Sequence, residues 1–229
     1  MALTPDYDSD PERFRLAARV TRKYLIGARS LHDHIAAKLL NDGPSHVLDI
    51  GCGEGALSHA LPAAPPFRIV GLDASAALLH AHPGPRLRAD ALRLPFRDGT
   101  FDIAVAVNLL YHLDDPVRAL REARRVLTPG GVLLVTAICR TDSPELAPVW
   151  RPEPTTFDAE EAPARVCEVF GEVEVERWDA PLLTLPDHDA VRDYLVARRV
   201  PKPEAARAAT RLSTPLPVTK RGCLVVARR

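Results

Sequence analysis

Short apolar runs alternate with segments of helical pattern through the middle of this chain of 229 residues. The apolar runs that predict strands cover residues 47–50, 68–73, 86–90, 101–108 and 132–138. The intervening segments that predict helices cover residues 55–61, 75–82 and 116–127. Such alternation is typical of βαβ units, in which helices cover both faces of a parallel sheet. We therefore expect an α/β fold built on a mostly parallel sheet.

Helical pattern precedes this region, and a mixed pattern follows it. Residues 10–40 predict two helices divided at Gly27, with Asp10 as the N-cap and Pro11 in the first turn. Beyond residue 138, the pattern predicts a helix over 158–170 capped by Asp158, a strand over 172–178, helices over 187–199 and 203–212, and a strand over 222–229. We expect an N-terminal helical cap over residues 1–44 and a main domain over 45–229, with a helical insertion over 181–217.

A glycine-rich segment, GCGEGALS, joins the first expected strand of the alternation to its first helix. It lacks the lysine of a P-loop, so that type of phosphate site is excluded. Gly51, Gly53 and Gly55 are spaced more tightly than the glycines of the dinucleotide fingerprint. Glu54 lies inside the loop, where a carboxylate would repel a pyrophosphate. The loop therefore predicts close approach of backbone to a ligand without phosphate groups.

Polar residues stand at the ends of the first four expected strands. Asp49 lies in the first strand, and Asp73, Asp90 and Asn108 end the next three. Open α/β sheets bind ligands in the crevice beyond the carboxyl ends of their strands. A carboxylate at Asp73 can accept both hydroxyls of a ribose, and Asp90 with the N–H of Ala91 can read an adenine edge. The pattern predicts a nucleoside ligand.

These segments resemble the motifs of the class I S-adenosylmethionine-dependent methyltransferases, in particular their small-molecule, type-11-like domains. VLDIGCGEG is similar to the first motif, IVGLDAS to the second, RADALRLPFRDGTFDIAVAVNLLYHLDDP to the third and fourth, and VLTPGGVLLV to the fifth. The resemblance is close over residues 47–138 and looser beyond them. It implies a Rossmann-like, seven-stranded, mostly parallel sheet with a reversed final hairpin. It also implies S-adenosyl-L-methionine as cofactor and S-adenosyl-L-homocysteine as product.

The resemblance further implies which positions hold this cofactor. Those around its methionine part are Asp49, Gly51, Cys52 and Gly53. Those around its ribose and adenine are Asp73, Ala74, Asp90 and Ala91. Those that contact its amino acid part and line the route to the substrate are Asn108 and Leu109. In similar proteins N-terminal helices form a lid, so Arg22 or Arg29 is expected at the cofactor carboxylate and Tyr24 over the cofactor. The alternative for both is an ordinary helix face with one core aromatic.

Two neighbouring residues after the fourth expected strand are candidates for catalysis. Methyl transfer from a sulfonium is an in-line displacement, so alignment of the reacting atoms is the main requirement. A base is needed only where the acceptor must lose a proton. His112 suits that role because its unperturbed pKa is about 6.5, and Tyr111 is the second candidate. A purely conformational role is the alternative for each.

Charge and cysteine content limit the partners. Thirty Lys and Arg residues balance thirty Asp and Glu residues, which disfavours nucleic acid as a partner. The four cysteines include no Cys-x-x-Cys pair, so we expect reduced thiols, no metal site and a cytoplasmic protein. The polar opening residues do not resemble a secretory signal, and no apolar run reaches the ~20 residues of a membrane span. A monomer or homodimer is expected.

The sequence therefore favours direct methyl transfer to O, N or C of a small molecule, with the 181–217 insertion covering the acceptor site. Methylation of RNA or protein is one alternative, which a basic face around the cleft would favour. A non-catalytic S-adenosylmethionine-binding regulatory protein is a second alternative. An NAD-linked oxidoreductase is disfavoured by the glycine spacing and by Glu54.

Overall fold

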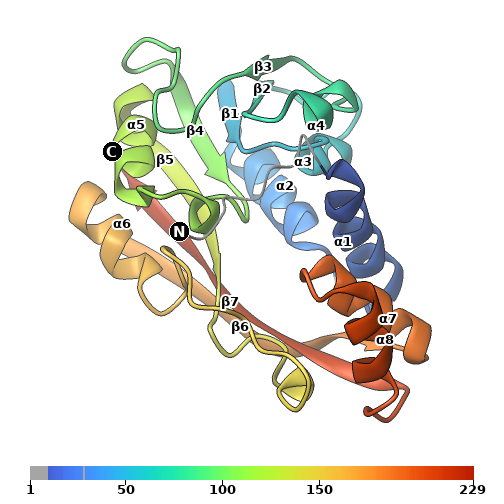
Figure 1. The fold of residues 1–229 in the computed structure, drawn as a ribbon. Coiled ribbons are helices and arrows are strands. Elements are labelled where there is room, and N and C mark those ends of the chain that lie inside the picture. The colour runs from blue at the N-terminus through green and yellow to red at the C-terminus, as the bar shows by residue number, and fades with distance from the viewer. Residues whose placement is uncertain (1–9, 28) are drawn as a thin grey trace.

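The computed structural model describes residues 10–27 and 29–229. Residues 1–9, on which the expectation about a secretory signal rests, lie outside the described residues. Within the described part, seven strands form one sheet in the order β3-β2-β1-β4-β5-β7-β6 (Figure 1). Strands β1 to β5 pair in parallel, and β7 runs antiparallel between β5 and β6. The expected mostly parallel sheet with a reversed final hairpin is confirmed.

The parallel strands lie close to their expected positions. They are β1 (His46–Ile50), β2 (Arg68–Asp73), β3 (Arg86–Arg88), β4 (Phe101–Ala106) and β5 (Leu127–Ile138). The antiparallel strands β6 (Val173–Leu185) and β7 (Leu216–Arg228) are longer than expected. Pro181 and Pro217 had indicated breaks. Both are accommodated, because β6 is an edge strand with a register shift at Pro181, and β7 pairs with β5 only from Gly222 onward.

Eight α-helices and two short 3₁₀ helices lie within the described residues. The α-helices are α1 (Pro11–Tyr24), α2 (Leu31–Asp42), α3 (Ala56–Ala60), α4 (Ala76–His80), α5 (Pro116–Val126), α6 (Ala162–Phe170), α7 (His188–Ala197) and α8 (Lys202–Ala209). The 3₁₀ helices are η1 (Leu110–His112) and η2 (Pro144–Leu146). Asp10 caps α1 as expected, since its carboxylate accepts from the Arg13 N–H at 3.2 Å. None of these helices is long and apolar enough to cross a membrane.

The expected cap of α6 is wrong. The helix begins at Ala162, and its N-cap residue Glu161 makes no side-chain capping bond. Asp158 is buried instead and accepts from Nε of Arg140 at 2.6 Å and from the Thr155 hydroxyl at 2.6 Å. The carboxylate that the sequence assigned to the helix therefore orders the preceding loop.

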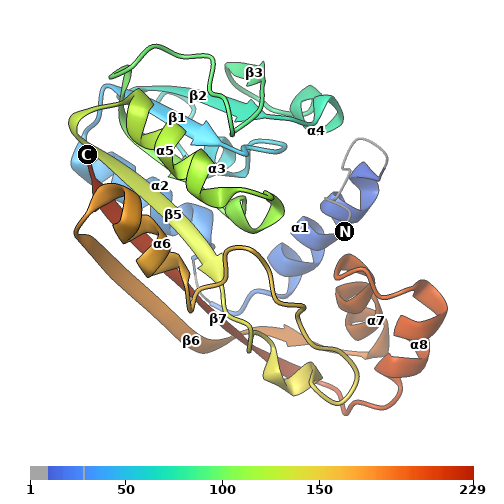
Figure 2. The same cartoon turned by 60° about the vertical axis from the view of Figure 1, so that its left-hand side comes forward.

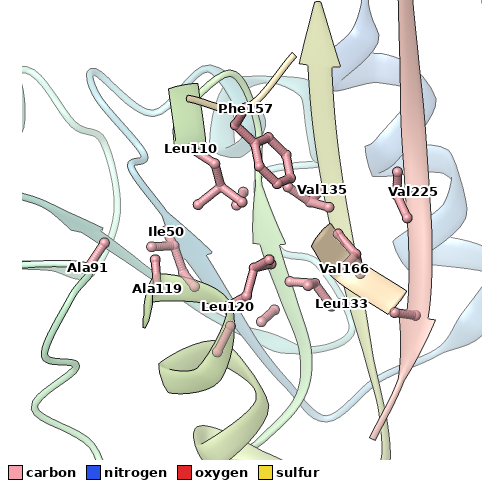
Figure 3. Packing of buried hydrophobic residues seen from close by; sticks show 14 of the residues in the cluster. Ile50, Ala91, Leu110, Ala119, Leu120, Leu133, Val135, Phe157, Val166 and Val225 are labelled. Atoms are coloured by element: carbon pink, nitrogen blue, oxygen red, sulfur yellow. The ribbon is translucent and has the colours of Figure 1, made fainter. Parts of the chain in front are cut away.

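Two apolar clusters cover the two faces of the sheet. The first packs α5 and α6 against residues such as Ile50, Leu133 and Val135 (Figure 3). The opposite cluster packs α2 and α3 against the alternate strand positions, including Val47 and Ile103. This alternation of sides follows from the period of two along each strand. The helices thus fix the sheet as a rigid platform whose carboxyl edge faces α1.

A third cluster lies apart from the sheet core. It joins α1, α7, α8 and the outer ends of β6 and β7, and its members include Val20, Leu183 and Val218. In both overall views α1 runs between the sheet and the α7–α8 pair (Figures 1 and 2). The expected insertion contains two helices, α7 and α8, but residues 181–185 and 216–217 belong to the strands that carry it.

Polar contacts also tie α7 to these strands. The Tyr194 hydroxyl, on α7, lies 3.0 Å from Oγ of Ser143, in the loop after β5. Nζ of Lys220, on β7, lies 3.4 Å from each of these two oxygens and also donates to Asp142. Tyr194 and Ser143 are buried, so these contacts are shielded from water. They fix the direction of α7 relative to the hairpin.

Candidate active site at the carboxyl edge of the sheet

The glycine loop folds back onto the end of β2. The N–H groups of Gly51 and Cys52 both donate to the carbonyl of Leu72, at 2.7 and 3.0 Å. Gly51 has a φ of 73°, in the region that favours glycine. A Cβ atom there would lie 2.7 Å from Cδ1 of Leu109, so the loop also abuts the segment after β4. Three expected site residues therefore come together here.

Asp73 connects two loops at the end of β2. Its Oδ2 accepts from the Gly53 N–H at 2.8 Å, and its Oδ1 accepts from the Ser75 N–H at 2.9 Å. The side chain is half-buried, and a carboxylate oxygen can accept more than one donor. Ala74, next along the chain, is exposed, and its carbonyl accepts from Arg88. Asp73 is thus fixed by backbone and retains capacity for further donors.

Asp49 is buried beneath this loop. Asp49 is only 3% exposed, and its carboxyl group has no hydrogen-bond partner within residues 10–27 and 29–229. Burial, and then the neighbouring Asp73 carboxylate, raise the pKa of Asp49 to about 7. A buried carboxyl in this condition is complementary to a positive charge, because a cation would favour its ionised form.

Asp90 and Ala91 lie in the loop between β3 and β4. Asp90 is exposed, and its Oδ1 accepts from the Leu92 N–H at 2.8 Å, which forms a local turn. Ala91 is buried in the first cluster. One carboxylate oxygen of Asp90 is thus engaged by the loop itself.

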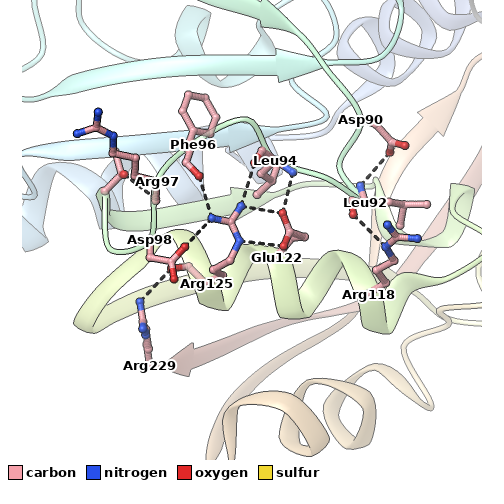
Figure 4. A network of polar contacts seen from close by, with 11 residues as sticks. Asp90, Leu92, Leu94, Phe96, Arg97, Asp98, Arg118, Glu122, Arg125 and Arg229 are labelled. Atoms are coloured by element: carbon pink, nitrogen blue, oxygen red, sulfur yellow. Dashed lines mark hydrogen bonds and ion pairs between the residues drawn. The ribbon is translucent and has the colours of Figure 1, made fainter.

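Helix α5 holds this loop in place (Figure 4). Arg118 donates to the Leu92 carbonyl at 3.1 Å, and Glu122 accepts from the Leu94 N–H at 2.8 Å. Arg125 donates to the carbonyls of Leu94 and Phe96 and to Glu122, at 2.8 to 2.9 Å. This network was not predicted from the sequence, although Glu122 and Arg125 stand at helical spacing.

Asn108, two residues after β4, adopts a left-handed backbone conformation. Its φ is 53°, which is uncommon for a residue with a side chain. Its N–H donates to Oγ1 of Thr136, on β5, at 2.9 Å. Such outliers cluster at binding and catalytic sites. The turn directs Leu109 toward the glycine loop and begins η1.

Tyr111 and His112 lie in η1, with ring centroids 4.2 Å apart. Tyr111 packs against the first cluster. Burial, followed by the positive charges of Arg199 and Arg13, lowers the pKa of His112 to about 4. Its imidazole is therefore neutral at pH 7.

Helix α1 contacts the glycine loop through residues that the sequence analysis missed. A Cβ atom at Gly53 would lie 2.9 Å from Cζ of Phe14, so this ring lies directly on the loop. Arg15 donates from Nε to Oε1 of Glu54 at 2.7 Å. Two features of the sequence could have indicated these contacts: Phe14 is an apolar residue near the start of the helix, and Arg15 has a charge opposite to that of Glu54.

The two α1 residues expected at the cofactor lie elsewhere. Tyr24 is ten positions beyond Phe14, or about 15 Å along the helix axis. It packs against the third cluster, and Nζ of Lys23 lies 4.9 Å from its ring centroid. Arg22 is exposed. The structure therefore does not bring Arg22 or Tyr24 to the site, and the alternative of an ordinary helix face with one packed aromatic fits both.

Comparison with known proteins relates this geometry to a family. The family described as "Methyltransferase domain" matches residues 48–135. A malonyl-[acyl-carrier protein] O-methyltransferase from Pseudescherichia vulneris is 30% identical over 173 residues, which cover 71% of this chain and 67% of that protein. The chain belongs to the S-adenosylmethionine-dependent methyltransferases. Membership implies S-adenosylmethionine as its cofactor.

Other relatives of this methyltransferase match over less of their length. A demethylmenaquinone methyltransferase from Lactiplantibacillus plantarum is 37% identical over 47% of this chain and 51% of its own. The chain thus spans about half the length, or less, of the first curated relatives it matches. Among solved structures, a [4+2]-cyclase superposes over 99% of this chain and 97% of its own, with a TM-score of 0.64 at 19% identity. That likeness establishes the fold alone.

The residues at the carboxyl edge fit the cofactor of the methyltransferase family. S-adenosylmethionine has no phosphate and carries positive charge on its sulfur and its amino group. Asp49 supplies a buried carboxyl without a hydrogen-bond partner among the described residues, and Asp73 keeps acceptor capacity beside the loop. Glu54, which would oppose a phosphate, is compatible with such a ligand.

Proposed function

We propose that this chain is an enzyme that transfers a methyl group from S-adenosylmethionine to O, N or C of a neutral or anionic small molecule. The observation that carries the proposal is the contact between the glycine loop and Asp73, with the buried Asp49 beneath it. Bound there, the cofactor supplies an electrophilic methyl group. The direction of attack is then set by what lies around η1, α1 and the α7–α8 pair.

We assign the cofactor contacts as follows. Asp49 neutralises the positive charge of the methionine part, and Gly51, Cys52 and Gly53 give it backbone access. Asp73 accepts from the ribose hydroxyls with the lone pairs that Gly53 and Ser75 leave free, and Ala74, Asp90 and Ala91 face the adenine. Asn108 and Leu109 border the amino acid part. Phe14 and Arg15 replace Arg22 and Tyr24 as the α1 residues that cover the loop.

The charges around η1 indicate the kind of acceptor. Arg13 and Arg199 both act on His112, and the Arg199 side chain is exposed with no hydrogen bond or ion pair among the described residues. Their charges disfavour a cationic acceptor. Because the pKa of His112 is held at about 4, the ring is a weak base. We propose that His112 accepts a hydrogen bond from the acceptor and that Tyr111 orients this ring through their tilted ring contact.

We propose that the acceptor site is covered and suits a small molecule, in contrast to an open surface for RNA or protein. The third cluster places α7 and α8 beside α1, in keeping with an insertion that covers a small molecule. We therefore retain the division into a cap over residues 1–44 and a main domain over 45–229. Zero net charge and four free thiols support a cytoplasmic protein that does not bind nucleic acid, and a monomer or homodimer remains our proposal. Light scattering and a DNA and RNA binding assay test these points.

Direct measurement of methyl transfer tests the main proposal, because a [4+2]-cyclase shares the fold. The purified chain is incubated with S-adenosylmethionine labelled in its methyl group and with matched carboxylate, phenol and amine acceptors. We expect label to enter carboxylate or phenol acceptors, with S-adenosylhomocysteine formed in equal amount. Tight cofactor binding without transfer to any acceptor class would support the regulatory alternative. Preferential labelling of amines that are cationic at neutral pH would contradict the assigned charge preference.

A further inference from the structure

The His82 side chain is buried behind the glycine loop, and none of the roles assigned above involves it. It follows α4 and is 4% exposed. A Cβ atom at Gly71, on β2, would lie 2.6 Å from its Nε2, and one at Gly55, in the glycine loop, would lie 2.8 Å from its Cδ2. The imidazole is therefore wedged between the loop after β1 and the strand that ends in Asp73. Any larger residue at either glycine would displace it.

Only one of the two ring nitrogens of His82 has a hydrogen-bond partner among the described residues. Nδ1 lies 3.1 Å from the backbone N of Gly84 and 3.3 Å from its carbonyl oxygen, so it can accept from the first or donate to the second. Nε2 is buried and has no hydrogen-bond partner among the described residues. Sγ of Cys52 would lie 2.7 Å from the same Gly71 Cβ position, so Nε2 points into the space beside this thiol. An apolar side chain would fill that space without leaving a polar ring nitrogen unpaired.

We propose that His82 is a positioning residue for the cofactor: its neutral ring sets the separation between the glycine loop and β2, and protonation of the ring disrupts the Gly53–Asp73 contact and weakens cofactor binding. The two elements that it separates are those that Asp73 joins from the opposite direction, through Gly53. In the protonated ring both nitrogens carry protons: Nδ1 can donate to the Gly84 carbonyl, but the Nε2 proton has no acceptor among the described residues, so the loop must move to relieve it.

The groups around His82 determine when this occurs. Burial is the largest influence and lowers the pKa of His82; the Gly84 hydrogen bond and Asp73 raise it, while the charges of Arg86 on β3 and His59 on α3 lower it. Burial raises the pKa of the Cys52 thiol, so Cys52 stays uncharged and cannot compensate the ring. His82 is therefore neutral at pH 7 and becomes charged only on acidification.

Calorimetry of S-adenosylhomocysteine binding tests this inference. The variants are His82→Ala, which empties the wedge, His82→Gln, which cannot titrate, and the control His80→Ala, an exposed position on α4. At about pH 8 we expect His82→Ala to weaken binding about tenfold, equivalent to 1.4 kcal/mol. The KM for S-adenosylmethionine should rise similarly, with kcat within about twofold, and His80→Ala should leave both unchanged.

The pH profile separates positioning from simple packing. Between about pH 8 and about pH 5, wild-type affinity should fall more steeply than that of His82→Gln, whose remaining slope reflects Asp49. Equal slopes, or equal affinities of His82→Ala and His80→Ala, would overturn the proposal. If His82→Ala does not fold, the slope of His82→Gln decides. Since binding needs no turnover, a chain that never methylates would refute the proposed function and leave this test intact.

Discussion

Arg15 of α1 and Glu54 of the glycine loop form an ion pair, with Nε and Oε1 2.7 Å apart. The pair joins the N-terminal helix to the cofactor loop, and Phe14 of the preceding position lies on Gly53. Both charged side chains remain in contact with solvent, so salt weakens the pair. We infer that the pair governs how readily α1 leaves the loop.

The first prediction follows from this pair. Glu54→Gln should increase the rate of S-adenosylhomocysteine dissociation about threefold at low salt, since exposed pairs contribute little energy. The increase should vanish at high salt, where the wild-type pair is screened. Stopped-flow displacement measures it, with Arg19→Ala, an exposed position on α1, as control. Equal dissociation rates at low salt would show that the pair does not hold the helix.

The raised pKa of Asp49 predicts that protein stability and cofactor affinity respond to pH in opposite directions. Its folded-state pKa of about 7 lies above the value near 4 of an unfolded chain, so the folded state binds the extra proton. Stability of the cofactor-free protein should therefore decline as pH rises from about 4 to about 7. Affinity for the cationic cofactor should increase over the same range, because only the ionised carboxylate attracts it.

Asp49→Asn tests both responses. The variant should flatten the decline in stability, measured by urea unfolding at several pH values, and should lose the rise in S-adenosylmethionine affinity. An unchanged pH dependence of stability would mean that Asp49 is not the titrating group.

Asp73 should contribute strongly to cofactor affinity. Asp73→Ala removes the acceptor for the Gly53 and Ser75 N–H groups and for the ribose, and should weaken S-adenosylhomocysteine binding by about 1–3 kcal/mol. Asp90→Ala should cost less, because Asp90 is exposed. Isothermal calorimetry measures both, and unchanged affinity in Asp73→Ala would remove the ribose assignment.

Arg199 combines strain with charge. Its φ of 68° places it in the left-handed region at the end of α7, where glycine is preferred. Arg199→Gly should therefore stabilise the fold by about 1 kcal/mol while raising the KM for an anionic acceptor. Thermal unfolding and steady-state kinetics measure the two effects, with the exposed Arg211→Ala as control. A variant with improved stability and unchanged KM would exclude Arg199 from acceptor recognition.

His112 should act as a hydrogen-bond acceptor. His112→Asn retains this ability but cannot take up a proton, so kcat should stay within about tenfold of wild type with the same pH profile above pH 6. A loss of about a thousandfold in kcat would restore the general-base role.

The sequence predicted the fold correctly where a few neighbouring residues determine the local structure. Asp10 with Pro11 marks the start of α1, and the glycine loop marks the junction of β1 and α3. Pro181 misled the prediction because a proline on an edge strand loses no ladder bond, and edge position is a property of the whole sheet.

The site was predictable where it depends on strand order and not where it depends on helix placement. Asp73 and the glycine loop meet because parallel strands end at one edge. Which turn of α1 reaches the loop depends on how the third cluster holds that helix, so Phe14 and Arg15 were missed in favour of Arg22 and Tyr24. His82 was also missed, since its relation to Gly55 and Gly71 requires three-dimensional packing.

The cluster that joins α1, α7 and α8 has a core of its own. Substitutions there can change the volume and polarity above η1 without opening a cavity in the sheet. The Tyr194–Ser143–Lys220 contacts would keep the angle of α7 constant through such changes, because hydrogen bonds are directional and apolar packing is not. A chain of this design can diversify what it recognises while the platform beneath stays constant.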